Sequence, residues 1–120
     1  MFNINNSSCS LIGVVHVDAL PGAAGYNGDM NGIVEKAVAE SEIYKAGGME
    51  AIIIENMHDA PYLKGHVEPE STAAMAVLGK AVKEATRLPV GMQILAGANL
   101  DALGAAIAGG LDFIRVEGFV

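Results

Sequence analysis

Two ten-residue segments of the 120-residue chain share one pattern, and each ends in a glutamate. Ala46–Glu55 (AGGMEAIIIE) and Ala108–Glu117 (AGGLDFIRVE) both read Ala-Gly-Gly, an apolar residue, an acid, a variable residue, Ile, a variable residue, a β-branched residue and Glu. Such glycines commonly end a helix, and the β-branched run after them predicts a buried strand. Carboxylates at the ends of two strands could serve as general acid and base or bind a hard divalent cation, although the pattern identifies no particular metal.

A histidine and an aspartate follow the first apolar run of the chain. We take His16 and Asp18, together with Glu55 and Glu117, as the candidate catalytic residues. Histidine suits acid–base or ligand roles near neutral pH. The alternatives stay open: His16 could be a hydrogen-bonded core residue, and Asp18 could cap the turn that follows it. Arg115 could likewise neutralise the two glutamates in a structural ion pair.

Five further polar residues are candidates for substrate binding. Asn56, His58 and Asp59 follow the second strand, where barrel enzymes place substrate contacts. Gln93 and Arg115 lie on the third and fourth predicted strands. A solvated polar loop is the alternative interpretation of the first three. No phosphate loop, dinucleotide fingerprint, zinc-protease motif or nucleophile elbow is present, so the sequence names no cofactor.

Four short strands alternate with three helices along the chain. The strands are predicted at Leu11–Val17, Ala51–Glu55, Pro89–Leu95 and Phe113–Glu117. The first helix is predicted from Ile33 to Ala46, and the second begins near Pro69 with Met75, Leu78 and Val82 inward. The third is predicted to start at an N-cap, Asn99, with Leu100, Leu103 and Ile107 inward. The order β-α-β-α-β-α-β indicates parallel strands joined by right-handed crossovers.

The two faces of the predicted sheet differ in polarity. One face is apolar and carries Val15, Val17, Ile52, Ile54, Met92, Ile94, Ile114 and Val116. The other is polar toward the carboxyl ends of the strands and carries His16, Asp18, Glu55, Gln93, Arg115 and Glu117. A doubly wound sheet would bury this polar set under helices, whereas a barrel places it around an open mouth. We therefore predict an α/β fold of the parallel (βα)n TIM-barrel type.

The chain has half the strands of a complete barrel. A (βα)₈ barrel takes about 250 residues, with about 200 as a floor. We predict a polar N-terminal tail at residues 1–10 and the N-terminal half of a barrel at residues 11–120. The first and fourth strands would then have open edges, which favour self-association or pairing with a missing C-terminal half.

Composition excludes several classes of protein. A net charge of −7 without any basic cluster argues against nucleic-acid binding. No apolar run reaches the length of a membrane span, so direct membrane insertion is not expected. A single cysteine and a polar N-terminus without a basic region indicate a reducing compartment. We expect an acidic cytoplasmic protein.

An ordered set of short motifs resembles the BtpA/SgcQ family of aldolase-type TIM barrels. The matching pieces run from Leu11 to the last residue, and they are Gly13-Val14-Val15-His16 before Leu20-Pro21-Gly22, Glu55-Asn56 with Asp59-Ala60-Pro61, Pro69-Glu70 with Ala73-Ala74-Met75, Pro89-Val90-Gly91, and Asp112-Phe113-Ile114-Arg115-Val116. Two departures are Gly97-Ala98-Asn99, where members often have an Arg-Asn-Asp-like segment, and Glu117, where Asn is common. Family members are also about twice as long.

The resemblance implies a fold more than a reaction. The family is named for a role in photosystem I biogenesis in cyanobacteria, and its members sit among ribulose-phosphate-binding-type barrels. One expectation is therefore a protein that binds or transforms a small phosphorylated or carbohydrate-like metabolite at the barrel mouth, with a divalent metal as an open possibility. The alternatives are a non-enzymatic biogenesis factor that acts through a protein partner, or an inactive truncated product.

Overall fold

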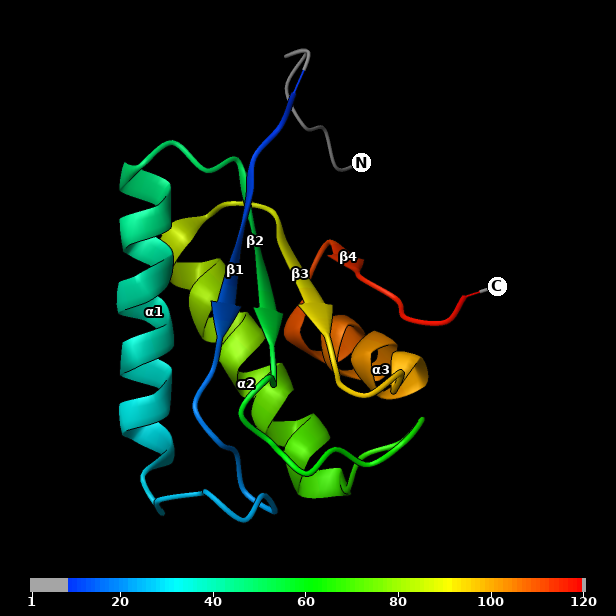
Figure 1. The fold of residues 1–120 in the computed structure, drawn as a ribbon. Coiled ribbons are helices and arrows are strands. Elements are labelled where there is room, and N and C mark those ends of the chain that lie inside the picture. Colours follow the sequence, from blue (N-terminus) through cyan, green and yellow to red (C-terminus); the bar gives the residue numbers. More distant parts are fainter. Residues whose placement is uncertain (1–8, 120) are drawn as a thin grey trace.

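The computed structural model describes residues 9–119 and confirms the predicted α/β fold class. Four parallel strands lie side by side in chain order, β1 (Ile12–His16), β2 (Ala51–Glu55), β3 (Val90–Gln93) and β4 (Phe113–Ile114). Three helices connect them, α1 (Met30–Ala46), α2 (Pro69–Thr86) and α3 (Asn99–Gly109). The sheet is thus one half of a (βα)₈ barrel in strand number and order (Figure 1).

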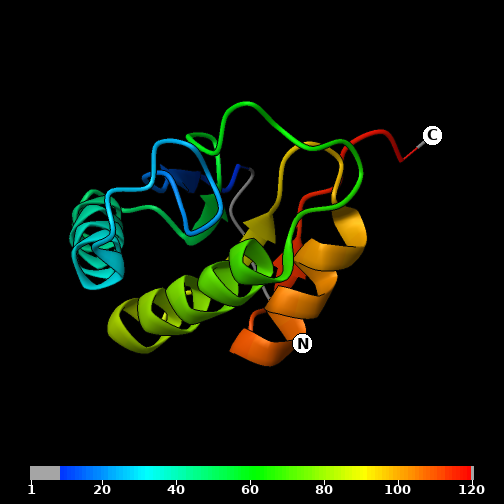
Figure 2. The same cartoon turned by 90° about the horizontal axis from the view of Figure 1, so that it is seen from below.

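All three helices pack against the same face of the sheet (Figure 2). The side chains predicted for the apolar face form this core, and Val15, Ile54 and Met92 are each at most 1% exposed. On α2, Met75, Leu78 and Val82 are fully buried, as their spacing predicted. Val116 is the exception at 37% exposure, because β4 ends at Ile114 and the alternation of the strand does not extend that far.

The ends of α1 and α2 follow from particular residues. Helix α1 begins three residues before the predicted start because the side chain of Asp29 caps it, accepting a 2.9 Å hydrogen bond from the Gly32 N–H. It ends at the Gly-Gly pair, where Gly48 has a φ of +91°. Helix α2 begins at Pro69, as predicted, and ends at Thr86, where the C-cap residue Arg87 has a left-handed conformation.

The predicted orientation of α3 was wrong. Leu100, Leu103 and Ile107 are 83%, 43% and 73% exposed. The buried stripe consists of Ala102, Ala105 and Ala106, whose small side chains let α3 approach the sheet and α2 closely. Asn99 was also predicted as the N-cap but is the first helical residue, and Ala98 occupies the cap position.

The face without helices has two layers of side chains. The lower layer, formed by Val14, Ile53, Gly91 and Phe113 in register, is apolar. A Cβ on Gly91 would lie 2.2 Å from Cε2 of Phe113, so only glycine leaves room for this ring. The upper layer is polar and lies at the carboxyl ends of the strands.

We predict that Gly91→Ala destabilises the fold by about 1–3 kcal/mol, because the added methyl group overlaps the Phe113 ring. Chemical denaturation of the two proteins measures the change. Combining the substitution with Phe113→Ala should recover part of the loss, as expected for a pair in direct contact. Gly104→Ala is the control: nothing lies within 4 Å of its added Cβ, so it should stabilise α3 slightly. Equal effects of the two alanine substitutions would contradict the prediction.

Candidate functional site

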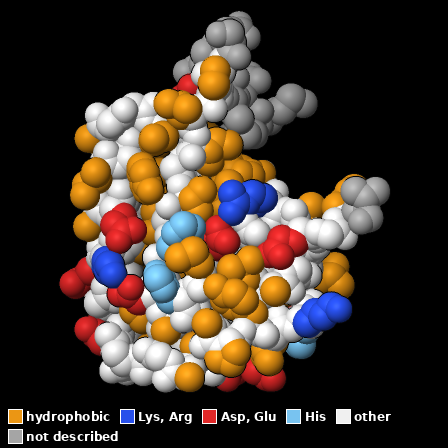
Figure 3. Space-filling model, viewed as in Figure 1, with side chains coloured by type: hydrophobic (Ala, Val, Ile, Leu, Met, Phe, Trp, Pro, Cys, Tyr) orange, Lys and Arg blue, Asp and Glu red, His pale blue; other side chains and the backbone are white. Residues whose placement is uncertain are grey.

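A row of polar side chains crosses the upper layer from β1 to the segment after β4. Nε2 of His16 lies 3.5 Å from Oε2 of Glu55, and Nη2 of Arg115 donates a 2.8 Å hydrogen bond to the same oxygen. Nε of Arg115 donates to Oε1 of Gln93, whose Nε2 donates a 3.0 Å hydrogen bond to Oε1 of Glu117. We call these five residues the polar row. Charged side chains gather in the middle of this face (Figure 3).

The members of the polar row differ in their access to solvent. The side chain of Glu55 is only 9% exposed, and Gln93 is buried as well. His16 and Arg115 keep 40% and 46% of their side chains exposed. A shielded carboxylate therefore lies between two accessible cationic or potentially cationic groups. Every buried side-chain nitrogen or oxygen in residues 9–119 has a hydrogen-bond partner.

The two glutamates of the polar row have different partners. Arg115 pairs with Glu55, as the ion-pair alternative required, but the carboxylate of Glu117 contacts the amide of Gln93 instead. The two glutamates are thus joined through Gln93 and Arg115.

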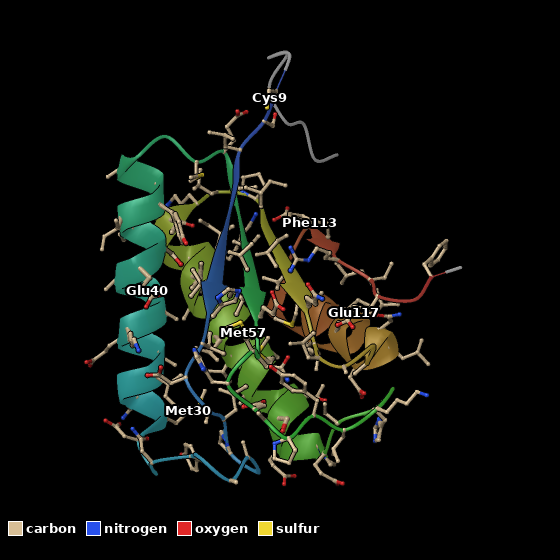
Figure 4. The ribbon with its side chains drawn as sticks, in the orientation of Figure 1. Cys9, Met30, Glu40, Met57, Phe113 and Glu117 are labelled. Atoms are coloured by element: carbon tan, nitrogen blue, oxygen red, sulfur yellow. The ribbon has the colours of Figure 1, made fainter. Side chains whose placement is uncertain are left out.

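Asn99 holds Glu117 in place, a role that the sequence did not reveal. Nδ2 of Asn99 donates to the Glu117 carbonyl at 2.9 Å, and the Glu117 N–H donates to Oδ1 of Asn99 at 3.2 Å. This pair of hydrogen bonds anchors the segment after β4 at the start of α3, and Figure 4 shows Glu117 beside that end of the helix. The only signal in the sequence was an asparagine after the third strand, which a helix cap explained equally well.

Asp18 does not join the polar row, which corrects its predicted place on the polar face. Its Oδ1 accepts a 2.7 Å hydrogen bond from Nζ of Lys36 on α1. The hydrogen bond and the charge of Asp18 raise the pKa of Lys36. Strand β1 ends at His16, so the alternation of side chains no longer determines which way residue 18 points. Nor does Asp18 cap the following turn, because the Leu20 N–H donates to Asp59.

Asn56 and Asp59 tie three loops together. Oδ1 of the buried Asn56 accepts a 2.7 Å hydrogen bond from the Leu95 N–H, and its Nδ2 donates to Oδ2 of Asp59 at 3.2 Å. Oδ1 of Asp59 accepts from the Leu20 N–H at 2.7 Å. These two residues were predicted to bind substrate. Their side chains instead make these hydrogen bonds to groups in the loops after β1, β2 and β3. His58, from the same prediction, is exposed on the loop.

A hollow of about 280 Å³ lies beside this junction, between the loops that follow β1 and β2. Its wall includes Ala23, Asn56, Asp59, Tyr62 and Ser71. Most of the lining is apolar or backbone, so the hollow offers few free hydrogen-bonding groups to a ligand.

Residues 9–119 contain neither a cluster of metal-ligating side chains nor a helix that could span a membrane. No three His, Cys, Asp or Glu side chains in this range are grouped so that they could hold a metal ion. Oε2 of Glu55 already accepts a hydrogen bond from the guanidinium of Arg115. No helix in the same range is long and apolar enough to cross a membrane.

The polar row is suited to proton exchange and to hydrogen bonding with a ligand. The imidazole of His16 is accessible and lies against a shielded carboxylate, which is the usual arrangement for orienting a histidine acid or base. Arg115 has further N–H groups beyond the two that its neighbours engage. Glu117 supplies a second carboxylate at the other end of the row.

Comparisons with known proteins agree on family and fold. A sequence model described as the BtpA family matches residues 7–120. The chain is 38% identical over 98% of its length to an uncharacterised mitochondrial protein of Caenorhabditis elegans, and it covers 44% of that protein. It is 41% identical to an uncharacterised protein of Methanocaldococcus jannaschii, with 89% of the chain and 41% of the relative covered.

A named relative and a solved structure add to these matches. Photosystem I biogenesis protein BtpA of Synechocystis is 37% identical over 89% of this chain, which covers 37% of it. The chain therefore spans less than half the length of these relatives. The carboxyl transferase domain of Rhizobium etli pyruvate carboxylase, solved with pyruvate, superimposes with a TM-score of 0.52 at 28% identity and covers 91% of this chain but 16% of that one.

We predict that Asp59 makes stability depend on acid pH. Burial raises the pKa of Asp59 above its usual 3.8, outweighing the opposing hydrogen bonds from Leu20 and Asn56 and the charge of His58. The folded state then binds this proton more tightly than the unfolded state does. Its contribution to stability is complete below pH 3.8 and is lost as the pH rises through the folded-state value.

Denaturation of the parent chain and of Asp59→Asn across that window measures this contribution. The stability of the parent relative to Asp59→Asn should fall as the pH rises from below 3.8, because asparagine does not titrate. Parallel stability curves for the two proteins would show that the folded-state pKa of Asp59 is not raised.

Proposed function

The chain belongs to the BtpA family of TIM-barrel proteins, and from this we propose that it supplies the acid–base and hydroxyl-binding part of a barrel mouth that acts on a small carbohydrate-like or phosphorylated metabolite. The observation that carries the proposal is the polar row, since it joins side chains of β1, β2, β3 and the segment after β4 on the face that a barrel encloses. As the chain covers less than half of its relatives, the activity of a whole family member is part of the proposal.

Each member of the polar row has a role in this proposal. His16 exchanges a proton with the ligand, and Glu55 orients the imidazole from 3.5 Å. Arg115 holds Glu55 and offers its remaining N–H groups to ligand oxygens. Gln93 positions Arg115 and Glu117 through its two hydrogen bonds. Glu117 acts as a second acid–base group or accepts a hydrogen bond from a ligand hydroxyl. Asp18, Asn56 and Asp59 receive no chemical role because Lys36 and loop groups engage their side chains.

The charge of the polar row favours hydroxyl groups over phosphate as its direct ligand. With His16 neutral, two carboxylates and one guanidinium leave a net charge of −1, which repels an anion. Alternating donors and acceptors suit the hydroxyls of a sugar. The phosphate site of many barrels follows strands seven and eight, so a phosphate on the same metabolite would bind outside these four strands.

A second candidate is a biogenesis factor that acts through a protein partner. The name of the Synechocystis relative favours it. In that case exposed helix residues should matter for function and the polar row should not. For either candidate, the net charge of −7 and the single cysteine support a cytoplasmic location as part of the proposal.

NMR titration of the 120-residue chain tests the ligand class. We expect ribose to shift the signals of the His16 ring, the Gln93 side-chain amide and Arg115 Nε, and ribose 5-phosphate to bind through the same groups. Inorganic phosphate alone should not shift them. Pyruvate serves as a comparison, because the R. etli domain was solved with it.

Substitutions then separate the polar row from the rest of the surface. Glu117→Gln should weaken sugar binding about tenfold, the effect of losing about 1.4 kcal/mol in a hydrogen bond to a charged acceptor. Glu84→Gln, an exposed position on α2, is the matched control and should leave binding unchanged. The proposal fails if no sugar shifts these signals, or if both variants weaken binding equally.

A further inference from the structure

The hollow of about 280 Å³ beside Asn56 is large enough for one flat ring and small for a whole ligand. Apolar side chains from three loops line it, and they include Ala23, Tyr62, Leu63, Val67 and Leu95. An apolar protein cavity of about 150 Å³ takes a benzene ring, whereas pockets for drug-sized ligands begin near about 300 Å³. All lining residues lie between Gly22 and Leu95, so neither outer edge of the sheet contributes to this site.

The loop between β2 and α2 forms one wall of the hollow, and its neighbours hold it in place. The Gly65 N–H donates to the Ala96 carbonyl at 2.8 Å, and the Ala96 N–H donates to the Leu63 carbonyl at 3.1 Å. Further along, the Val67 N–H donates to Oδ2 of Asp101 at 3.1 Å. Figure 2 shows this loop reaching the start of α3. The wall is thus formed before a ligand arrives, which lowers the entropic cost of binding.

The charge of the wall disfavours an anionic occupant. Asp59 and Glu68 contribute to the lining, and no lysine or arginine of residues 9–119 is among the lining residues. The Glu70 carboxylate lies against Gly22, where an added Cβ would be 2.9 Å from its Oε1. A phosphate or carboxylate would therefore be repelled. Tyr62 brings an aromatic ring to the wall, and such rings favour stacked or edge-to-face contacts with another flat ring.

The hollow adjoins the polar row. Asn56, which lines the hollow, directly follows Glu55, and Leu95 follows Gln93 by two residues. Cα atoms of consecutive residues lie only about 3.8 Å apart, so the two sites share the carboxyl ends of β2 and β3. A sugar held in the polar row by its hydroxyls would present its substituent to the hollow.

We propose that the hollow binds a flat, uncharged ring, and that this ring is the substituent of the sugar held in the polar row. The link to the sugar rests on the proposed function, whereas the ring site rests on the walls of the hollow alone. The ligand class is then a glycoside with an aromatic or heteroaromatic aglycone. Its hydroxyls bind the polar row, and its apolar ring fills a space that offers few hydrogen-bonding groups.

Titration of the 120-residue chain with matched ribosides tests the site. Calorimetry measures the affinity of methyl riboside, phenyl riboside and carboxyphenyl riboside, and NMR locates each ligand. We expect the phenyl riboside to bind about tenfold more tightly than the methyl riboside, because the hollow removes its ring from water. It should also shift the signals of the Tyr62 ring and the Leu95 methyl groups, which the methyl riboside leaves unchanged. The carboxyphenyl riboside should lose this gain against the acidic wall.

Substitutions in two different loops separate the hollow from the polar row. Tyr62→Ala removes an aromatic wall and should abolish the gain of the phenyl riboside without changing the affinity for the methyl riboside. Tyr62→Phe is the matched control, since it keeps the ring and loses only the hydroxyl bond to the Met57 carbonyl. Ala23→Leu narrows the hollow from the loop after β1 and should have the same selective effect as Tyr62→Ala.

Three results would overturn the ring site. They are a phenyl riboside that binds no tighter than the methyl riboside, a carboxyphenyl riboside that binds as tightly as the phenyl riboside, and variants that weaken both neutral ribosides equally. Shifts of the His16 ring with both neutral ribosides would preserve the proposed function in the first case. If the phenyl riboside instead shifts Tyr62 and Leu95 while no riboside shifts His16, the proposed function fails and the ring site stands.

Discussion

The three helices cover only one face of the sheet, and this constraint determines where every functional group of the chain lies. Side chains of a strand alternate between faces, so the aliphatic half of each strand enters the core and the other half remains on the uncovered face. On that face the amino ends of the strands hold an apolar layer and the carboxyl ends hold His16, Glu55 and Gln93 in register. The polar row is a direct consequence of parallel strands that end at the same edge.

Within the polar row, the shielded carboxylate of Glu55 governs the arrangement of its neighbours. A carboxylate removed from water is costly unless charged or hydrogen-bonding partners compensate it. His16 at the end of β1 and Arg115 just after β4 supply that compensation. Gln93 then fixes the guanidinium, and Asn99 fixes the segment that carries Glu117. The same contacts that stabilise Glu55 therefore also order the groups that a ligand would meet.

Where each candidate side chain points was easier to predict inside the strands than in the loops that follow them. His16, Glu55 and Gln93 lie on the predicted face, because strand alternation requires it. Arg115 follows β4 directly, and its hydrogen bonds to Gln93 and Glu55 hold it on the same face. Asp18, two residues after the end of β1, points to Lys36 instead. Asn56 and Asp59 follow β2 as predicted, yet they tie loops together, since unpaired N–H groups of Leu20 and Leu95 needed acceptors. The path of the chain determines which backbone groups in the loops need a hydrogen-bond partner. A local sequence pattern does not predict that path.

The sequence by itself determined the order of the elements and the parallel half-barrel fold, because these follow from hydrophobic period and from glycine and proline positions. An ordered set of short motifs identified the family by resemblance. Only the tertiary structure decided which partners the polar side chains take and which side of α3 is buried. Both alanines and leucines on that helix can form an inward stripe, and the space available between α3, α2 and the sheet selected the alanines. The distance between a helix and the sheet depends on how the layers assemble, so the sequence of α3 alone does not predict it.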